Sequence, residues 1–288
     1  MVRLIIEIVE RERRKKYVYN VATLKKYGNR YKVTWNAVVR NKGISVDRVG
    51  KGQASDKKAE CNIRRAKQAI KEYALCNEWE YFVTFTLDKT KQDRYDLKAY
   101  IKKLGEMIKN LNRNRKVPIT YLLIPERHKD GAWHMHGFVN GLLDDDLEVA
   151  MTRNNKIVYH WIKYGQKFGF NDLEKIEDKE KASSYITKYV TKDLSRGVDE
   201  INAKTYYCSR NLKRAEIIKK GTVSAKYSPT FKCEVDGALV YSEMWLPHNT
   251  TLEKAYSYVH DITKRDVWQD AIEKETGEVL VEVPMEWI

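Results

Sequence analysis

The chain has 288 residues and a formal net charge of +14, and it is 42% apolar and 33% charged. This length allows one large domain or two modest ones with a buried core, and the composition is ordinary for a globular protein. No window approaches the roughly 18 uninterrupted apolar residues of a membrane span, and the N-terminus lacks a signal-peptide pattern. We therefore expect a cytoplasmic protein.

Charge is distributed unevenly along the chain. Residues 1–75 carry 20 basic and 7 acidic side chains, whereas residues 240–288 carry 4 basic and 10 acidic ones. A basic N-terminal part with interleaved tyrosines fits a surface that faces a polyanion, although a generally basic protein would have the same composition. The cysteines form no Cys-x-x-Cys pair, which disfavours a disulfide framework or a cysteine zinc site. They are Cys61, Cys76, Cys208 and Cys233.

The N-terminal part predicts a β-hairpin followed by a loop and a helix. Residues 17–40 are rich in Val, Tyr and Thr around Tyr27-Gly28-Asn29, which is typical of two strands joined by a turn. Residues 41–56 are polar and contain three glycines, so we place a boundary near residue 55. Asp56 can cap a helix that runs to about Cys76.

The middle of the chain has a clearer rhythm of strands and helices. Residues 81–87 are β-branched and aromatic, which predicts a strand. A helix is expected over residues 94–112, because apolar residues recur there at steps of four and three. Residues 119–124 and 133–139 predict two strands joined by a turn at Asp130-Gly131, hence a hairpin.

Further along, the pattern predicts mixed structure and sets the fold class. Residues 143–163 read as partly helical, residues 167–176 as a possible strand, and residues 179–194 as a helix. The order of elements indicates an α+β fold with an antiparallel central sheet and helices packed on one face. We expect a basic β-rich extension (1–55), a central domain (56–200) and a C-terminal extension with an acidic tail (201–288).

Two histidines in the predicted strand 133–139 suggest a metal site. His134 and His136 are two residues apart, so both imidazoles project from one face of a strand. Glu126 ends the preceding strand and would share that face if it opposes His134. Two histidines and a carboxylate leave coordination positions open for catalysis. His128 is a weaker candidate in the loop, and histidines on a sheet surface are also often satisfied by ordinary hydrogen bonds.

Two tyrosines on the predicted helix 179–194 suggest a nucleophile. Tyr185 and Tyr189 are four residues apart on one helix face, and Lys188 and Lys192 share the neighbouring stripe. A tyrosine hydroxyl can attack a phosphodiester to give a phosphotyrosine, and a nearby lysine can offset charge on the phosphate. The alternative is a core-facing aromatic stripe beside solvated lysines.

Taken together and in this order, these stretches resemble the HUH superfamily of rolling-circle replication initiators, of the type found in phages and plasmids. Residues 82–86 (Phe-Val-Thr-Phe-Thr) look like its first motif, and Glu126 with residues 134–136 (His-Met-His) looks like its metal-binding motif. Residues 185–192 (Tyr-x-x-Lys-Tyr-x-x-Lys) look like its tyrosine motif. The resemblance covers about residues 80–195.

The resemblance implies a function and a set of partners. The family fold is an RRM-like or ferredoxin-like antiparallel sheet with the metal site on one face and the tyrosine helix alongside. Its members nick and rejoin a single-stranded or hairpin DNA origin through a 5′-phosphotyrosine intermediate, with Mg²⁺ or Mn²⁺. By this likeness Tyr185, Tyr189 and Lys188 would be catalytic, Glu126, His134 and His136 would bind the metal, and Thr84, Thr86 and Lys192 would contact DNA.

Several alternatives remain open at this point. A transposase of the same superfamily would share the chemistry and act on transposon ends. A non-catalytic basic DNA-binding protein would keep all its function without Tyr185, and a zinc hydrolase would release water-cleaved products with no protein–DNA linkage. The sequence contains no Walker-type phosphate-binding motif, so we expect any helicase to come from the bacterial host or the phage.

Overall fold

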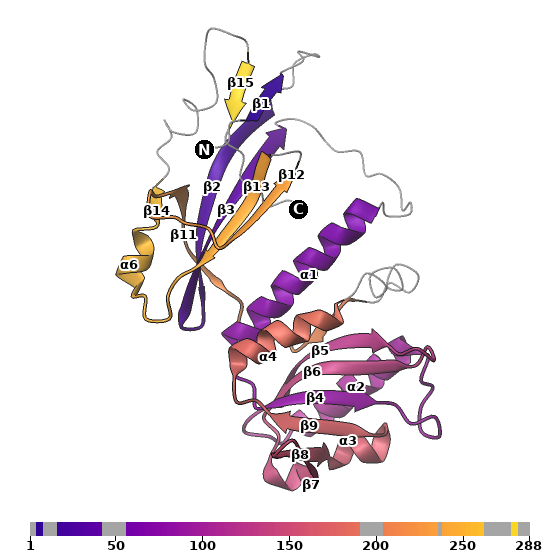
Figure 1. Ribbon diagram of the computed structural model, residues 1–288. Coiled ribbons are helices and arrows are strands. Elements are labelled where there is room, and N and C mark those ends of the chain that lie inside the picture. Colours follow the sequence, from indigo (N-terminus) through magenta and orange to yellow (C-terminus); the bar gives the residue numbers. More distant parts are fainter. Residues whose placement is uncertain are drawn as a thin grey trace. The chain divides into compact units, whose positions relative to one another are not determined.

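The computed structural model describes residues 4–7, 16–41, 56–190, 204–235, 238–261 and 278–281. The chain divides into two compact units, one spanning Ser55–Arg214 and the other combining Met1–Ala54 with Ala215–Ile288. Each unit contains a large antiparallel sheet (Figure 1), as expected for the predicted α+β class.

The Ser55–Arg214 unit is built on a seven-stranded sheet with the strand order β10-β5-β6-β4-β9-β8-β7. Its strands are β4 (Tyr81–Thr86), β5 (Thr120–Arg127), β6 (Trp133–Asn140), β7 (Leu147–Arg153), β8 (Lys156–Trp161), β9 (Asn171–Lys175) and β10 (Tyr207–Cys208). Its helices are α1 (Asp56–Cys76), α2 (Leu97–Asn112), α3 (Ile162–Lys167) and α4 (Lys179–Tyr185), with 3-10 turns η1 (Asp144–Asp146) and η2 (Ile186–Tyr189). In the part of the chain that the structure describes, no helix is long and apolar enough to cross a membrane.

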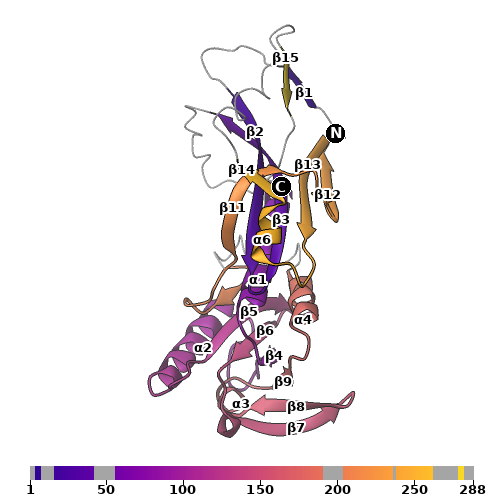
Figure 2. The same ribbon diagram turned by 90° about the vertical axis from the view of Figure 1, so that its left-hand side faces the viewer.

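Helices cover both faces of this sheet, so the expectation that they pack on one face was too narrow. The ring of Tyr164 from α3 stacks on Phe85 of β4, with centroids 4.2 Å apart. On the opposite face, the rings of Tyr185 and Tyr189 pack against Phe82. Figure 2 shows α2 and α4 on opposite sides of the sheet. Because side chains alternate along β4 and are apolar on both sides, each face needs its own cover.

The prediction of partly helical structure over residues 143–163 was largely wrong. This stretch forms the β7–β8 hairpin, and a helix begins only at Ile162. Asn154 and Asn155 connect the strands with φ angles of 51° and 60°. Two consecutive positive φ angles are the signature of a type I′ turn, and asparagine adopts them more readily than most residues.

Other predicted elements agree more closely with the structure. The helix expected from Asp56 to about Cys76 is α1, and the hairpin strands expected around Asp130-Gly131 are β5 and β6. The helix α2 begins later than expected, because the Asp96 carboxylate accepts a hydrogen bond from the Ala99 amide and caps it. The helix predicted over residues 179–194 becomes α4 and then η2, and residues 191–194 lie outside the described part of the chain.

The second unit joins segments from both ends of the chain. Its six-stranded sheet has the order β12-β13-β3-β2-β11-β14, and a separate pair links β1 to β15. The predicted N-terminal hairpin is confirmed as β2 and β3, with a turn at Gly28. Leu24, Val33 and Met244 pack with Ala255 from the helix α6 in a small core. The elements are β1 (Leu4–Glu7), β2 (Lys16–Tyr27), β3 (Arg30–Asn41), β11 (Glu216–Val223), β12 (Phe231–Val235), β13 (Ala238–Trp245), α6 (Leu252–Tyr256), β14 (Val259–Asp261) and β15 (Glu278–Val281).

The close approach of β5 and β6 leads to a stability prediction at Gly137. A Cβ atom added there would lie 2.0 Å from the carbonyl oxygen of Leu122, so the two strands would have to separate. We expect Gly137→Ala to lower the free energy of unfolding by about 1–3 kcal/mol, measured by urea denaturation. Gly105→Ala is the control, because a Cβ at this position in α2 meets nothing within 4 Å and helix propensity alone should add about 0.5–1 kcal/mol. Equal stability of the two variants would contradict the close approach.

Candidate active site

Strand register places the predicted metal ligands on one face of the sheet. In the β5–β6 hairpin, Glu126 lies directly opposite His134. In the β4–β6 pair, Thr84 lies opposite His136 and Thr86 lies opposite His134. Directly opposed residues of antiparallel strands share a face. The condition stated for Glu126 is therefore met, and the two threonines lie on the same face.

Both histidines are held by hydrogen bonds through the ring nitrogen Nδ1. The Thr84 hydroxyl lies 3.2 Å from His136 Nδ1, and the Thr86 hydroxyl lies 3.1 Å from His134 Nδ1. On the far side of its ring, His136 Nε2 is 2.7 Å from Glu126 Oε2. Because a carboxylate can only accept, His136 Nε2 carries the proton and Nδ1 accepts from Thr84. A threonine hydroxyl can donate or accept, so it can hold the ring in either tautomer.

Burial keeps these imidazoles uncharged at neutral pH. Burial lowers the pKa of His134 below its usual value of 6.5, and His128 nearby lowers it further. Burial likewise lowers the pKa of His136, and the opposing effect of the Glu126 carboxylate is smaller. Neutral imidazole is the form that binds metal ions.

The donor types fit a divalent cation, but the side chains do not converge on one point. Among the described residues, no group of three or more His, Cys, Asp or Glu side chains is arranged to hold a metal ion. The reason is visible in the contacts: Glu126 bonds to His136, while the ring of His134 stacks on His128 with centroids 5.0 Å apart. Glu126 is partly exposed, so its carboxylate has room to leave that hydrogen bond. His134, His136 and Glu126 are thus the residues that could hold Mg²⁺ or Mn²⁺ after a side-chain adjustment.

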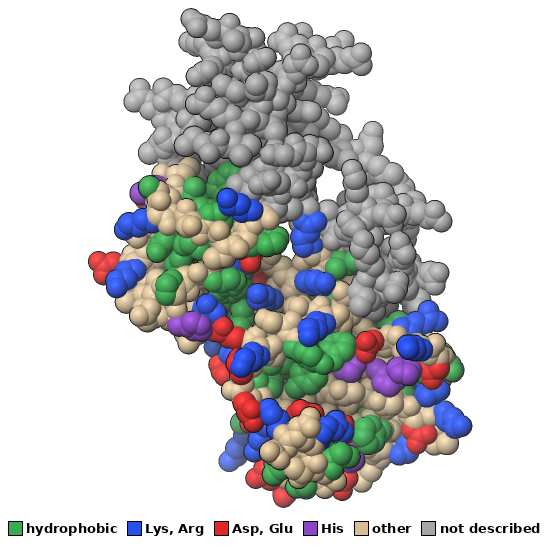
Figure 3. Space-filling view, viewed as in Figure 1, with side chains coloured by type: hydrophobic (Ala, Val, Ile, Leu, Met, Phe, Trp, Pro, Cys, Tyr) green, Lys and Arg blue, Asp and Glu red, His purple; other side chains and the backbone are tan. Residues whose placement is uncertain are grey.

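The two tyrosines lie over the same face of the sheet. The ring of Tyr189 stacks on His136 with centroids 3.9 Å apart and an interplanar angle of 9°. Its hydroxyl donates a hydrogen bond to the Tyr185 hydroxyl at 3.2 Å. The Lys188 ammonium lies 4.7 Å from the centre of the Tyr185 ring. In the space-filling view, histidine side chains reach the surface of this unit beside a group of hydrophobic side chains (Figure 3).

The surroundings of the two tyrosines differ in a way that matters for attack on a substrate. Tyr185 is 45% exposed, whereas Tyr189 is half-buried. Burial raises the pKa of the Tyr189 hydroxyl well above its usual value of 10.0, and its hydrogen bond to Tyr185 raises it further. A substrate can therefore reach Tyr185 more easily than Tyr189.

Some of these contacts were missed by sequence reasoning. Thr84 and Thr86 have the same two-residue spacing as His134 and His136, so pairing β4 with β6 would have predicted the threonine–histidine contacts. The stacking of His128 on His134 could not be read from a loop residue. The expected DNA contacts at Thr84 and Thr86 stay predictions, and Lys192 lies outside the described residues.

A comparison with known families agrees with this site. Residues 80–194, about two fifths of the chain, match the model of a family described as replication-associated protein ORF2. The matched range contains the histidine pair and both tyrosines. The match supports a role as a replication initiator. No curated protein and no solved structure matches the chain.

The hydrogen bonds to the histidines lead to a spectroscopic prediction. In metal-free protein, ring ¹⁵N NMR should show His136 protonated on Nε2 at neutral pH, and both His134 and His136 should titrate below pH 6.5. Thr84→Val should shift the His136 ring signals and lower the free energy of unfolding by about 1 kcal/mol, because it removes the donor to Nδ1. Thr84→Ser keeps the hydroxyl and is the control. Titration of either ring above pH 6.5 would contradict the dominance of burial.

Proposed function

We propose that this protein initiates rolling-circle replication by nicking and rejoining single-stranded origin DNA through a covalent tyrosine intermediate. The observation that carries the proposal is the position of an exposed tyrosine hydroxyl, paired with a second one, over a sheet face that presents two neutral histidines and a carboxylate. The family match over residues 80–194 supports the replication role independently of this geometry.

The reaction assigns separate tasks to the two tyrosines. The Tyr185 oxygen attacks the scissile phosphorus, a new P–O bond forms, and the bond to the 3′-oxygen breaks. The phenolic proton leaves Tyr185 and the departing 3′-oxygen gains one, so a free 3′-OH and a 5′-phosphotyrosine result. The hydrogen bond that Tyr189 donates to Tyr185 stabilises negative charge on the attacking oxygen. The exposed Lys188 beside the Tyr185 ring can offset charge on the phosphate oxygens.

The covalent link preserves the energy of the phosphodiester bond, so the strand can be rejoined without a nucleotide cofactor. Two adjacent tyrosines would let one hold a 5′ end while the other attacks again, which releases a unit-length circle. Glu126, His134 and His136 would hold Mg²⁺ or Mn²⁺, and a bound cation would supply polarisation of the scissile phosphate. The partners we propose are a hairpin-containing phage or plasmid origin and a helicase that acts in trans in the cytoplasm of a bacterial host.

The role of Tyr185 is tested by covalent trapping. After incubation with origin-like single-stranded oligonucleotides and Mn²⁺, wild-type protein should form an adduct that survives boiling in detergent. Tyr185→Phe should reduce this adduct by at least about a hundredfold while DNA binding is retained. Tyr189→Phe should leave the first cleavage in place and impair the second. Tyr256→Phe is the matched control, because this tyrosine is similarly exposed at 41% but lies in the other unit.

The outcomes separate the proposal from its rivals. An unchanged adduct in both Tyr185→Phe and Tyr189→Phe would exclude the tyrosine mechanism. Free cleaved products without any protein linkage would indicate a hydrolase, and neither cleavage nor adduct would indicate a non-catalytic DNA-binding protein. Cleavage of transposon ends in preference to a replication origin would indicate a transposase.

The metal ligands are tested by binding rather than by activity. Isothermal titration of Mn²⁺ should give a site that is weakened about tenfold or more in His134→Ala and in Glu126→Gln, because each removes one donor. His260→Ala removes an exposed histidine from the other unit and should leave the affinity unchanged. Equal Mn²⁺ affinity in all three variants and the wild type would place the cation elsewhere.

A further inference from the structure

A pocket of about 500 Å³ lies on the sheet face opposite the histidines. It is bounded by the C-terminal half of α2, the first residues of β5 and the segment that follows β10. Tyr121 of β5 lines it, and Tyr121 and Glu126 are an odd number of positions apart along the strand, so the two side chains project from opposite faces. The pocket is therefore distinct from the candidate active site, although both lie on β5.

Positive charge without acidic compensation distinguishes this pocket. Lys109, Arg113 and Arg210 line it, and none of its described lining residues is acidic. All three basic side chains are exposed, and none has an ion-pair partner among the residues whose side chains are described. Other arginines of this unit are paired with carboxylates: Arg115 with Asp146, Arg153 with Asp172 and Arg214 with Glu72. Cations left unpaired around a concavity favour an anionic ligand.

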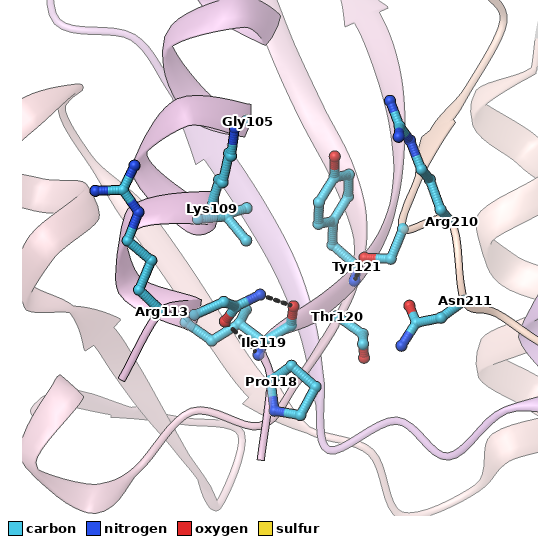
Figure 4. A pocket seen from close by; sticks show the side chains of 12 residues that line it. Gly105, Lys109, Arg113, Pro118, Ile119, Thr120, Tyr121, Arg210 and Asn211 are labelled. Atoms are coloured by element: carbon cyan, nitrogen blue, oxygen red, sulfur yellow. Dashed lines mark hydrogen bonds between the residues drawn. The ribbon is translucent and has the colours of Figure 1, made fainter. Parts of the chain in front are cut away.

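The arrangement of the basic side chains matches a nucleotide within a strand. Figure 4 shows the Tyr121 side chain between Lys109 and Arg113 on one side and Arg210 on the other. A nucleotide inside a strand has a phosphate on each side, whereas a free mononucleotide has one. Burial raises the pKa of Tyr121, so its hydroxyl stays protonated at neutral pH and can donate. An aromatic ring flanked by cations is a common platform for an unpaired base.

The walls of the pocket are fixed in place before any ligand binds. The Asn112 side chain bonds both backbone polar groups of Ile119, at 2.8 and 3.0 Å, which ties the end of α2 to the start of β5 (Figure 4). Ser209 exchanges two hydrogen bonds with the Tyr121 backbone, each of 3.0 Å. A pre-formed site loses less entropy when its ligand is ordered.

We propose that this pocket binds one nucleotide of single-stranded DNA, with its phosphates on Lys109, Arg113 and Arg210 and its base on Tyr121. The strand β10 is at the edge of the sheet and β5 is next to it. A strand anchored here can pass around that edge to the face that carries the histidines. The pocket then holds DNA beside the cleavage site, which extends the proposed function, but binding itself requires no cleavage.

Charge reversal tests the pocket by fluorescence anisotropy with labelled oligothymidylate and the full chain in EDTA. Lys109→Glu and Arg210→Glu should each weaken binding about tenfold and flatten its salt dependence. Lys98→Glu is the matched control, because it makes the same charge change at an exposed position of α2 outside the pocket, and it should stay within about twofold of wild type. Equal affinity of the three variants would overturn the proposal. Because EDTA removes divalent cations, failure of the nicking proposal would leave this result unchanged.

Two further comparisons separate a pocket from a basic surface, and a strand from a free nucleotide. Gly105→Phe adds bulk to the pocket without changing charge and should weaken binding, whereas Gly105→Ala should not. Wild-type affinity in Gly105→Phe, with an unchanged thermal unfolding curve, would overturn the pocket. In competition, oligothymidylate should displace the probe far better than dTMP at the same nucleotide concentration. Equal displacement by dTMP would overturn the assignment to a strand.

Discussion

The register of the three adjacent strands β5, β6 and β4 is the constraint on which the candidate active site depends. A shift by one residue in any of these strands would turn its polar side chains to the other face. The observed register sets Glu126 opposite His134 and aligns both threonines of β4 with both histidines of β6. Gly137 helps to hold this register, because the chain of β5 passes where a side chain at that position would lie.

From this register follows a division of work between the two faces of the sheet. One face carries polar groups whose hydrogen bonds orient neutral imidazoles, and the segment from α4 to η2 brings two tyrosines against it. The other face is covered by α2 and α3, and at its edge lies the basic pocket around Tyr121. A single-stranded DNA with contacts on both faces would be positioned by one and cut at the other.

Much of the site could be predicted from the sequence because it depends on periodicity. The two-residue spacing of the histidines fixes their common face, and the four-residue spacing of the tyrosines fixes their proximity. Side-chain contacts could not be predicted in the same way. The stacking of Tyr189 on His136, and the choice of Glu126 to bond one histidine rather than bridge both, depend on rotamers and packing. The β7–β8 hairpin was missed because its Asn154-Asn155 turn carries a weaker signal than the Asn-Gly pair typical of such turns.

The central claim, attack by Tyr185 next to the histidine pair, can be tested directly by locating the covalent DNA on the protein. Trypsin separates the two tyrosines, because cleavage after Lys181, Lys188 and Lys192 gives the peptides 182–188 and 189–192. After the first cleavage reaction and nuclease digestion, mass spectrometry should find a 5′-linked nucleotide phosphate on peptide 182–188. The same modification on peptide 189–192 alone, or on neither peptide, would contradict the account.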